Sequence, residues 1–169
     1  MFGIYAPIIA LATLCVLIAQ LSLQKQLYSH ETDLAYIPQA RTDVEFYCTQ
    51  LAKVMERKIY TEQTTRAALH EIFQPNIADK VDDGKHRELA IEIHRLAPGA
   101  VDLWSAIYPI LGGLAAGKTT NYQMTFNSSK QKLIAILSYE TCACLDNLHR
   151  ARTGGKIKVD YQFSPLMSI

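Results

Sequence analysis

The first 24 residues contain no Asp, Glu, Lys, Arg or His, and the first charged side chain is Lys25. A helix of about 20 apolar residues is long enough to cross the hydrocarbon core of a bilayer. A secretory signal peptide would begin with positive charge and end at a small-residue site such as A-x-A. Neither feature is present, since the run ends in IAQLS at 18–22. We therefore expect residues 1–24 to form a transmembrane anchor in a lipid bilayer and residues 25–169 to form a soluble domain.

The charges beside this segment leave its orientation open. No Lys or Arg precedes it, whereas Lys25 and Arg41 follow it. Counting positive charges, which gather on the cytoplasmic side, gives a weak preference for a cytoplasmic domain.

The composition of the remaining chain limits the classes of function. About 145 residues suffice for one domain. The whole sequence has 17 basic and 16 acidic residues, so its charge gives no reason to expect a nucleic-acid partner. The histidines do not show the spacing of a metal-binding or catalytic motif, and we expect no enzyme activity, no metal and no cofactor.

The four cysteines do not form a zinc-binding pattern, because Cys142 and Cys144 make a C-x-C pair and no second pair completes four ligands. Cys15 lies in the apolar segment and is expected to be a small apolar side chain. In an oxidising compartment, Cys48 could form a disulfide with either Cys142 or Cys144.

Residues 40–96 are predicted to be helical. Between 40 and 60 the apolar residues recur every three or four positions, which indicates one apolar stripe on an amphipathic helix. Pro38 stands between this helix and the apolar segment and is expected to kink or interrupt the helix. Two shorter helices are predicted before Pro98. The residues of the stripe are Val44, Tyr47, Cys48, Leu51, Val54, Met55 and Ile59.

Residues 106–169 are predicted to be rich in β-sheet. Apolar and polar residues alternate at 119–126 and again at 156–163, as in half-buried strands. A short apolar run at 132–139 has the length of a strand, and 127–131 is typical of a hairpin connection. A helix is expected at 141–151. Helices first and an antiparallel sheet later predict an α+β fold.

One segment matches a nucleotide-binding motif. Gly112, Gly117, Lys118 and Thr119 occupy the fixed positions of G-x-x-x-x-G-K-[ST]. A functional P-loop follows a buried strand and opens a helix, so that backbone N–H groups surround the phosphates. Here Pro109 interrupts the preceding segment, and a strand is predicted to follow. A glycine-rich turn is the favoured interpretation, with nucleotide binding as the alternative.

The order of these elements resembles that of type IV pilins and pseudopilins, in particular the type IVb branch. YPILGG at 108–113 is similar to the Asn-Pro-aromatic-Gly-Gly turn of that branch, and Leu96-Ala97-Pro98 is similar to its loop proline. KLIAILSYETCACLDNL at 132–148 resembles its strand, turn, Ala-Cys pair and helix. The resemblance implies a small antiparallel sheet packed on a long N-terminal helix. It also implies that Cys144 takes part in a disulfide, for which Cys48 is the partner outside the C-x-C pair.

The resemblance also implies an assembly role for the long helix. Small residues let transmembrane helices pack closely, and the stripe at 40–60 would continue the assembly face. The residues expected to line this face are Gly3, Ala6, Ala10, Val44, Leu51 and Met55.

We therefore predict a non-enzymatic, minor pilin-like subunit of a pilus or secretion-type assembly. Its partners would be the lipid bilayer and other subunits of the same assembly. The expected location is the inner membrane, crossed once, with the soluble domain in the periplasm or outside the cell. Two alternatives are a generic single-span component of a secretion or conjugation machine and a membrane-tethered P-loop protein.

Overall fold

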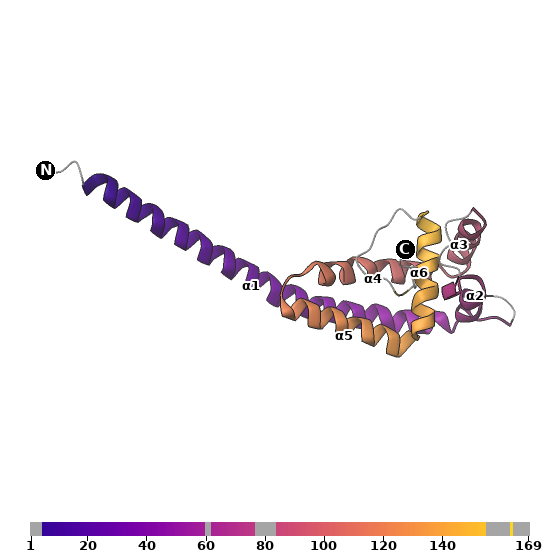
Figure 1. The fold of residues 1–169 in the computed structure, drawn as a ribbon. Helices are drawn as coiled ribbons and strands as arrows, with labels where there is room; N and C mark the ends of the chain where they lie inside the picture. The colour runs from indigo at the N-terminus through magenta and orange to yellow at the C-terminus, as the bar shows by residue number, and fades with distance from the viewer. Residues whose placement is uncertain (1–4, 60–61, 77–83, 155–162, 164–169) are drawn as a thin grey trace. The chain divides into compact units, whose positions relative to one another are not determined.

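The structure is a computed structural model that describes the chain except for residues 1–4, 60–61, 77–83, 155–162 and 164–169. The described part contains α-helices and one isolated antiparallel bridge, between Lys58 and Thr64. The helices are α1 (Tyr5–Met55), α2 (Thr65–Ile72), α3 (Gly84–Leu96), α4 (Pro98–Ala116), α5 (Thr120–Leu137) and α6 (Tyr139–Thr153) (Figure 1).

The predicted α+β fold is wrong, because the described residues contain no β-strand in the predicted sheet region. The segments expected to be two strands and a hairpin, 119–126, 127–131 and 132–139, lie almost entirely within the single helix α5. The predicted strand at 156–163 falls, except for Phe163, outside the described residues.

The sequence of α5 explains why this prediction failed. Its buried residues recur at every fourth position, as on one face of a helix. The two nearest its N-terminus are polar, Thr125 and Ser129, so the helical period is hidden from a search for apolar residues. The apolar side chains of the alternation at 119–126, Tyr122, Met124 and Phe126, are exposed or half-buried. The full set of buried positions is Thr125, Ser129, Leu133 and Leu137.

Helix α1 is assigned without a break through Pro38, where the sequence predicted a kink or interruption. Proline has no N–H, so the bond to the carbonyl of Leu34 is missing. The chain divides into two compact units at this residue, Met1–Pro38 and Gln39–Ile169.

Within the unit 39–169, the final turns of α1 bury the predicted apolar stripe. Val44, Cys48, Leu51 and Met55 are at most 1% exposed, together with Ala40 at 2%. The period of 3.6 residues in the sequence therefore identified this face correctly. Val44, Leu51 and Met55, expected to contact other subunits, instead form part of the core of their own chain.

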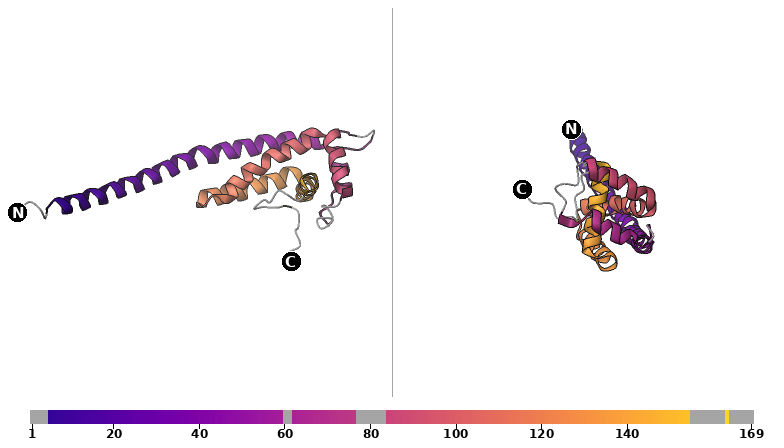
Figure 2. Two further views of the ribbon diagram at one scale, coloured as in Figure 1. Left: turned by 90° about the horizontal axis from the view of Figure 1, so that it is seen from above. Right: turned by 90° about the vertical axis from the view of Figure 1, so that its right-hand side faces the viewer.

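Helix α6 lies at the centre of the same unit. It packs on α2, α3, α4 and α5, and it crosses α4 and α5 steeply (Figures 1 and 2). Ser138 caps its first turn, and Gly154 ends it with a left-handed backbone at φ 62°. The predicted helix at 141–151 is confirmed, and its buried residues extend from Thr141 to His149 without a gap.

Helix α4 supplies Trp104, the largest fully buried side chain among the described residues, and several aliphatic side chains to this core. Trp104, Ile107, Leu111 and Leu114 are each at most 1% exposed. Pro98 occupies the first turn, where the missing N–H costs little. The adjoining corner between α5 and α6 brings Leu133 and Leu137 into the same core.

Candidate functional site

The most unusual surface in the described chain is the part of α1 at residues 5–24, here called the apolar segment. It has no charged residue, and those of its large side chains that the structure describes are at least half exposed. Lone exposed apolar residues are ordinary, but a contiguous surface of them marks a contact with lipid or another protein. The large exposed residues of the segment are Ile9, Leu11, Leu14, Val16, Leu17, Ile18, Leu21 and Leu23.

These side chains point in all directions around the helix. Successive residues of an α-helix are rotated by roughly 100°, because a turn has about 3.6 residues. Leu11 and Ile18 therefore share one side, Val16 and Leu23 the opposite side, and Leu14 lies near the first. The hydroxyl of Thr13 donates to the carbonyl of Ile9 at 2.8 Å, so this polar group is satisfied inside the helix. No side of the segment is charged.

The small residues predicted to line an assembly face cannot be placed on this surface. Gly3 lies outside the described residues. Ala6 and Ala10 belong to α1, but their side chains are outside the description.

The P-loop-like segment forms the corner between two helices. Gly112 lies inside α4, and Lys118 and Thr119 lie between α4 and α5, so the motif follows a helix where a P-loop follows a strand. The N–H of Gly117 donates to the carbonyl of Leu114 at 3.3 Å. This N–H therefore belongs to the end of α4 and does not form part of an open phosphate cradle.

Gly117 has a packing role at this corner. A Cβ atom there would stand 2.1 Å from Cγ of Tyr122, closer than any real contact. Gln123 reinforces the turn, since its side-chain amide donates to the carbonyl of Gly117 at 3.0 Å. The glycine in the motif is thus explained by the close approach of the Tyr122 ring.

The cysteines predicted as a candidate disulfide are free thiols in the structure. Cys48 and Cys144 are buried, and burial raises the pKa of Cys48 to about 11 and that of Cys144 to about 12. Burial also raises the pKa of Cys142. Such thiols stay protonated at neutral pH and are poor nucleophiles. Among the described residues, no group of three or more His, Cys, Asp or Glu side chains is arranged to hold a metal ion.

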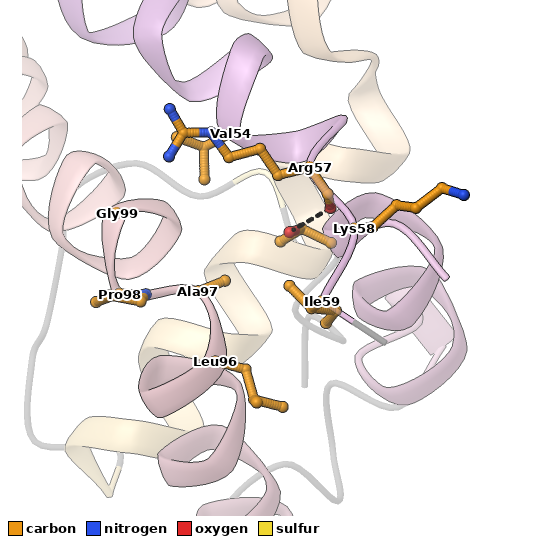
Figure 3. Close-up of a pocket in the computed structure, with 9 residues that line it drawn as sticks. Val54, Arg57, Lys58, Ile59, Leu96, Ala97, Pro98 and Gly99 are labelled. Carbon is orange, nitrogen blue, oxygen red and sulfur yellow. Dashed lines mark hydrogen bonds between the residues drawn. The ribbon is translucent and has the colours of Figure 1, made fainter. Parts of the chain in front are cut away.

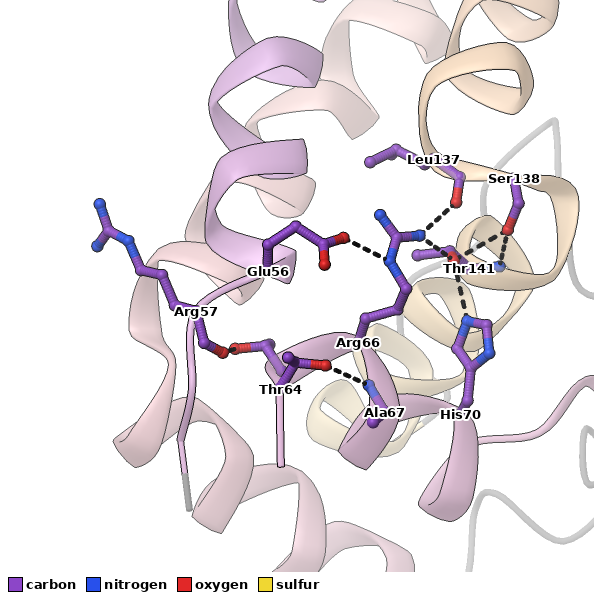
Figure 4. Close-up of polar contacts among 10 residues, drawn as sticks. Glu56, Arg57, Thr64, Arg66, Ala67, His70, Leu137, Ser138 and Thr141 are labelled. Atoms are coloured by element: carbon purple, nitrogen blue, oxygen red, sulfur yellow. Dashed lines mark hydrogen bonds and ion pairs between the residues drawn. The ribbon is translucent and has the colours of Figure 1, made fainter. Parts of the chain in front are cut away.

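Arg66 organises a polar cluster where three helices meet (Figure 4). Its Nε atom donates to Glu56 at 2.8 Å, and its Nη1 atom donates to the carbonyl of Leu137 at 2.7 Å and to the hydroxyl of Thr141 at 2.8 Å. His70 Nε2 lies 2.9 Å from the same hydroxyl. The cluster joins α2 to the corner between α5 and α6. The sequence analysis did not identify it, because Arg66 and Thr141 are 75 residues apart in the chain.

A second polar cluster lies inside the core. The hydroxyl of Tyr108 donates to Asp146, whose other oxygen accepts from the N–H of Phe163 at 2.6 Å. His149 stacks on Tyr108 with 4.3 Å between ring centroids, and its Nδ1 lies 3.3 Å from the hydroxyl of Ser105. Burial and the charge of Arg152 lower the pKa of His149 to about 4. Asp146 thus accepts hydrogen bonds from Tyr108 on α4 and from the backbone of Phe163, and it ties both to α6.

A small pocket of about 150 Å³ lies where the end of α1 meets α2 and the α3–α4 junction (Figure 3). Its walls are largely apolar, with Val54, Ile59 and Leu96 among them. The carbonyl of Arg57 accepts from the hydroxyl of Thr65 at 3.1 Å. The side chains of Arg57 and Lys58 extend in different directions and do not converge on one point (Figure 3).

One helix of the described part, α4, is long and apolar enough to cross a membrane, and 39% of the relevant window is buried inside the structure. Its buried face includes Trp104 and Leu111, so α4 is a core helix of the unit 39–169. The predicted localisation is thereby corrected. The structure does not support a single-pass inner-membrane protein with a periplasmic or extracellular domain, because among the described residues the helix that is long and apolar enough to cross a membrane is α4 and not the N-terminal helix.

Comparisons with known proteins find no family that matches the chain, and no curated protein or solved structure matches it significantly.

Proposed function

We propose that this protein is a non-enzymatic subunit of a lipid-associated assembly, and that lipid covers its apolar segment. The observation that carries the proposal is the charge-free helix at residues 5–24, whose large apolar side chains are exposed on every side. Fully burying one Leu or Ile side chain contributes about 1.5–3 kcal/mol. A helix with several such side chains exposed to water is therefore stabilised when lipid or another protein buries them.

The pattern around the helix favours lipid over a second protein helix. A coiled-coil partner would cover one narrow apolar stripe, and the other sides would carry charges. Here Val16 and Leu23 lie opposite Leu11 and Ile18, so one partner helix would leave half of the apolar surface in water. Lipid chains surround a helix on all sides. An amphipathic helix at a membrane surface would also need a charged face, which this segment lacks.

The contacts of the described titratable side chains support a structural role for residues 39–169. Arg66 and Tyr108 form hydrogen bonds that join helices to one another, and the pKa of the Cys48 thiol is raised. These are the properties of groups that stabilise a helical bundle. Membership in a pilus or a secretion system stays a prediction from the sequence.

Flotation with phosphatidylcholine vesicles tests the proposal. The full chain is expected to float with the vesicles, and a double variant, Leu14→Glu with Leu21→Glu, is expected to stay in the dense fraction. The matched control is Ile91→Glu on α3, which charges an equally exposed apolar residue outside the segment and should float like the wild type. The proposal fails if the wild-type chain stays in water as a defined oligomer, or if the double variant floats normally.

A further inference from the structure

A surface pocket of about 230 Å³ lies between α1 and α5, wholly within residues 39–169. Its lining residues are Arg41, Val44, Ser128, Ser129 and Lys132. Val44 and Ser129 are 1% and 4% exposed, so they form its base, whereas Ser128 is exposed at its rim. A cavity of about 150 Å³ can hold a benzene molecule. This pocket therefore has room for a small ligand group.

Two contacts between α1 and α5 fix the cations of the pocket. Arg41 Nη2 donates to the hydroxyl of Thr125 at 3.2 Å, and Lys132 Nζ donates to Glu45 Oε2 at 2.6 Å. The residue numbers rise together along both helices, so α1 and α5 run parallel at this place. Arg41 and Lys132 therefore lie toward opposite ends of the pocket. Ser128 and Ser129 come between Thr125, which contacts Arg41, and Lys132 in the sequence of α5.

The charges of these residues leave the pocket positive. Glu45 pairs with Lys132, whose hydrogen bond and charge lower the pKa of that carboxyl. Arg41 donates to a neutral hydroxyl, and no ion pair of the described residues includes it. Its guanidinium group has five N–H donors, and the hydrogen bond to Thr125 uses only part of that capacity. Two cations and one carboxylate give the site a net charge of about one positive unit.

We propose that this pocket binds a phosphate group, either as a soluble phosphate or as the headgroup phosphate of a lipid. Arginine matches the oxygens of phosphate with two parallel hydrogen bonds. The exposed hydroxyl of Ser128 supplies a further donor at the rim, and Lys132 adds positive charge at the other end. The site does not depend on the proposed lipid contact of residues 5–24, because every lining residue lies in the unit 39–169.

Calorimetric titration of the full chain in a maltoside detergent, which has no phosphate, tests the site. One arm uses inorganic phosphate, and the other uses short-chain phosphatidic acid, both against chloride at constant ionic strength. Arg41→Gln is expected to weaken binding about tenfold or more, as for loss of a hydrogen bond to a charged group. Lys53→Gln, which removes the same charge from an exposed position of α1 outside the pocket, is expected to bind like the wild type.

A second variant distinguishes loss of the binding site from loss of the fold. Ser128→Asp changes an exposed rim residue and is expected to abolish binding by charge repulsion while the helix content is unchanged. Saturable binding of both probes, or of either alone, supports the site, and the probe that binds identifies the phosphate source. The proposal is overturned if neither probe binds saturably, if Ser128→Asp binds normally, or if Lys53→Gln weakens binding as much as Arg41→Gln.

Discussion

The Nη1 atom of Arg66 donates to the hydroxyl of Thr141 at 2.8 Å, and this hydrogen bond connects α2 to the first turn of α6. The same atom also donates to the carbonyl of Leu137 at 2.7 Å, at the end of α5. One side chain thus holds the end of α5, the beginning of α6 and the beginning of α2 in one arrangement. The corner between α5 and α6 depends on this contact because Ser138, between them, has an unfavourable backbone conformation.

Replacing Arg66 with Ala is expected to lower the free energy of unfolding by about 2 kcal/mol, since the carbonyl of Leu137 and the hydroxyl of Thr141 lose a charged donor. Urea unfolding monitored by the fluorescence of Trp104, the single tryptophan, measures this change. Arg57→Ala is the matched control, because the contact of Arg57 with Thr65 uses its backbone carbonyl. Equal stability of the two variants would contradict the role given to Arg66.

Ser138 is the only described residue other than glycine with a positive φ, at φ 77° and ψ 152°. This region is unfavourable for residues with a side chain and costs about 1–3 kcal/mol. Ser138→Gly removes that cost and gives up the cap to the N–H of Thr141, which costs only a few tenths of a kcal/mol when glycine replaces serine. We expect it to raise the unfolding free energy by about 1 kcal/mol.

Ser138→Ala separates the two contributions, because alanine keeps the strained backbone and loses the cap. It is expected to lower stability by about 1 kcal/mol. Thermal unfolding followed by circular dichroism ranks the three proteins, with the glycine variant highest and the alanine variant lowest. If both variants lost stability equally, the backbone of Ser138 would not be strained.

Gly117→Ala is expected to destabilise the α4–α5 corner by about 1–3 kcal/mol, because the new methyl group would meet the Tyr122 ring. Gly112→Ala is the internal control. No atom lies within 4 Å of its added Cβ, and alanine favours a helix over glycine by about 1 kcal/mol. The same melting experiment should therefore move the two variants in opposite directions. Loss of stability in both would show that the packing at Gly117 is not specific.

His149 makes the stability of residues 39–169 sensitive to mild acid. Its pKa in the folded chain is about 4, against an ordinary pKa of 6.5 for an exposed histidine. The unfolded chain therefore binds the proton first, and stability falls as the pH is lowered from about 6.5 to about 4. The loss attributable to this residue is on the order of 3 kcal/mol, since each pKa unit corresponds to about 1.4 kcal/mol.

Urea titrations from pH 7 to pH 4.5 measure this dependence. His149→Gln is expected to be less stable at pH 7, because it loses the stacking on Tyr108, and its stability should change less with pH. His94→Gln is the control, because it also removes one histidine, but from a partly exposed position beside the exposed carboxylate of Asp102. A pH dependence in His149→Gln as steep as in the wild type would contradict the assignment.

The sequence predicted those features that depend on one helix alone. The apolar stripe at Val44, Leu51 and Met55 was correct, and so was the helix at 141–151, because a period of 3.6 residues is visible wherever the inward side chains are apolar. The same method failed in α5, where the inward positions Thr125 and Ser129 are polar. Their burial follows from packing against other helices, which no local pattern contains.

The two candidate sites also differ in whether the sequence alone can identify them. The charge-free segment that ends before Lys25 is a property of the sequence itself, since it requires only composition and length. The pocket between Arg41 and Lys132 joins residues more than 80 positions apart and depends on the parallel packing of α1 and α5.

The sequence by itself therefore determined that the chain has an apolar N-terminal segment and an amphipathic helix at 40–60. Only the tertiary structure decided that residues 120–137, predicted as strands and a hairpin, form a helix and that Gly117 serves packing. The physical reason is that hydrophobic periodicity reports which side of an element is apolar, whereas the partner of that side is chosen by contacts between distant residues, such as Arg66 with Thr141.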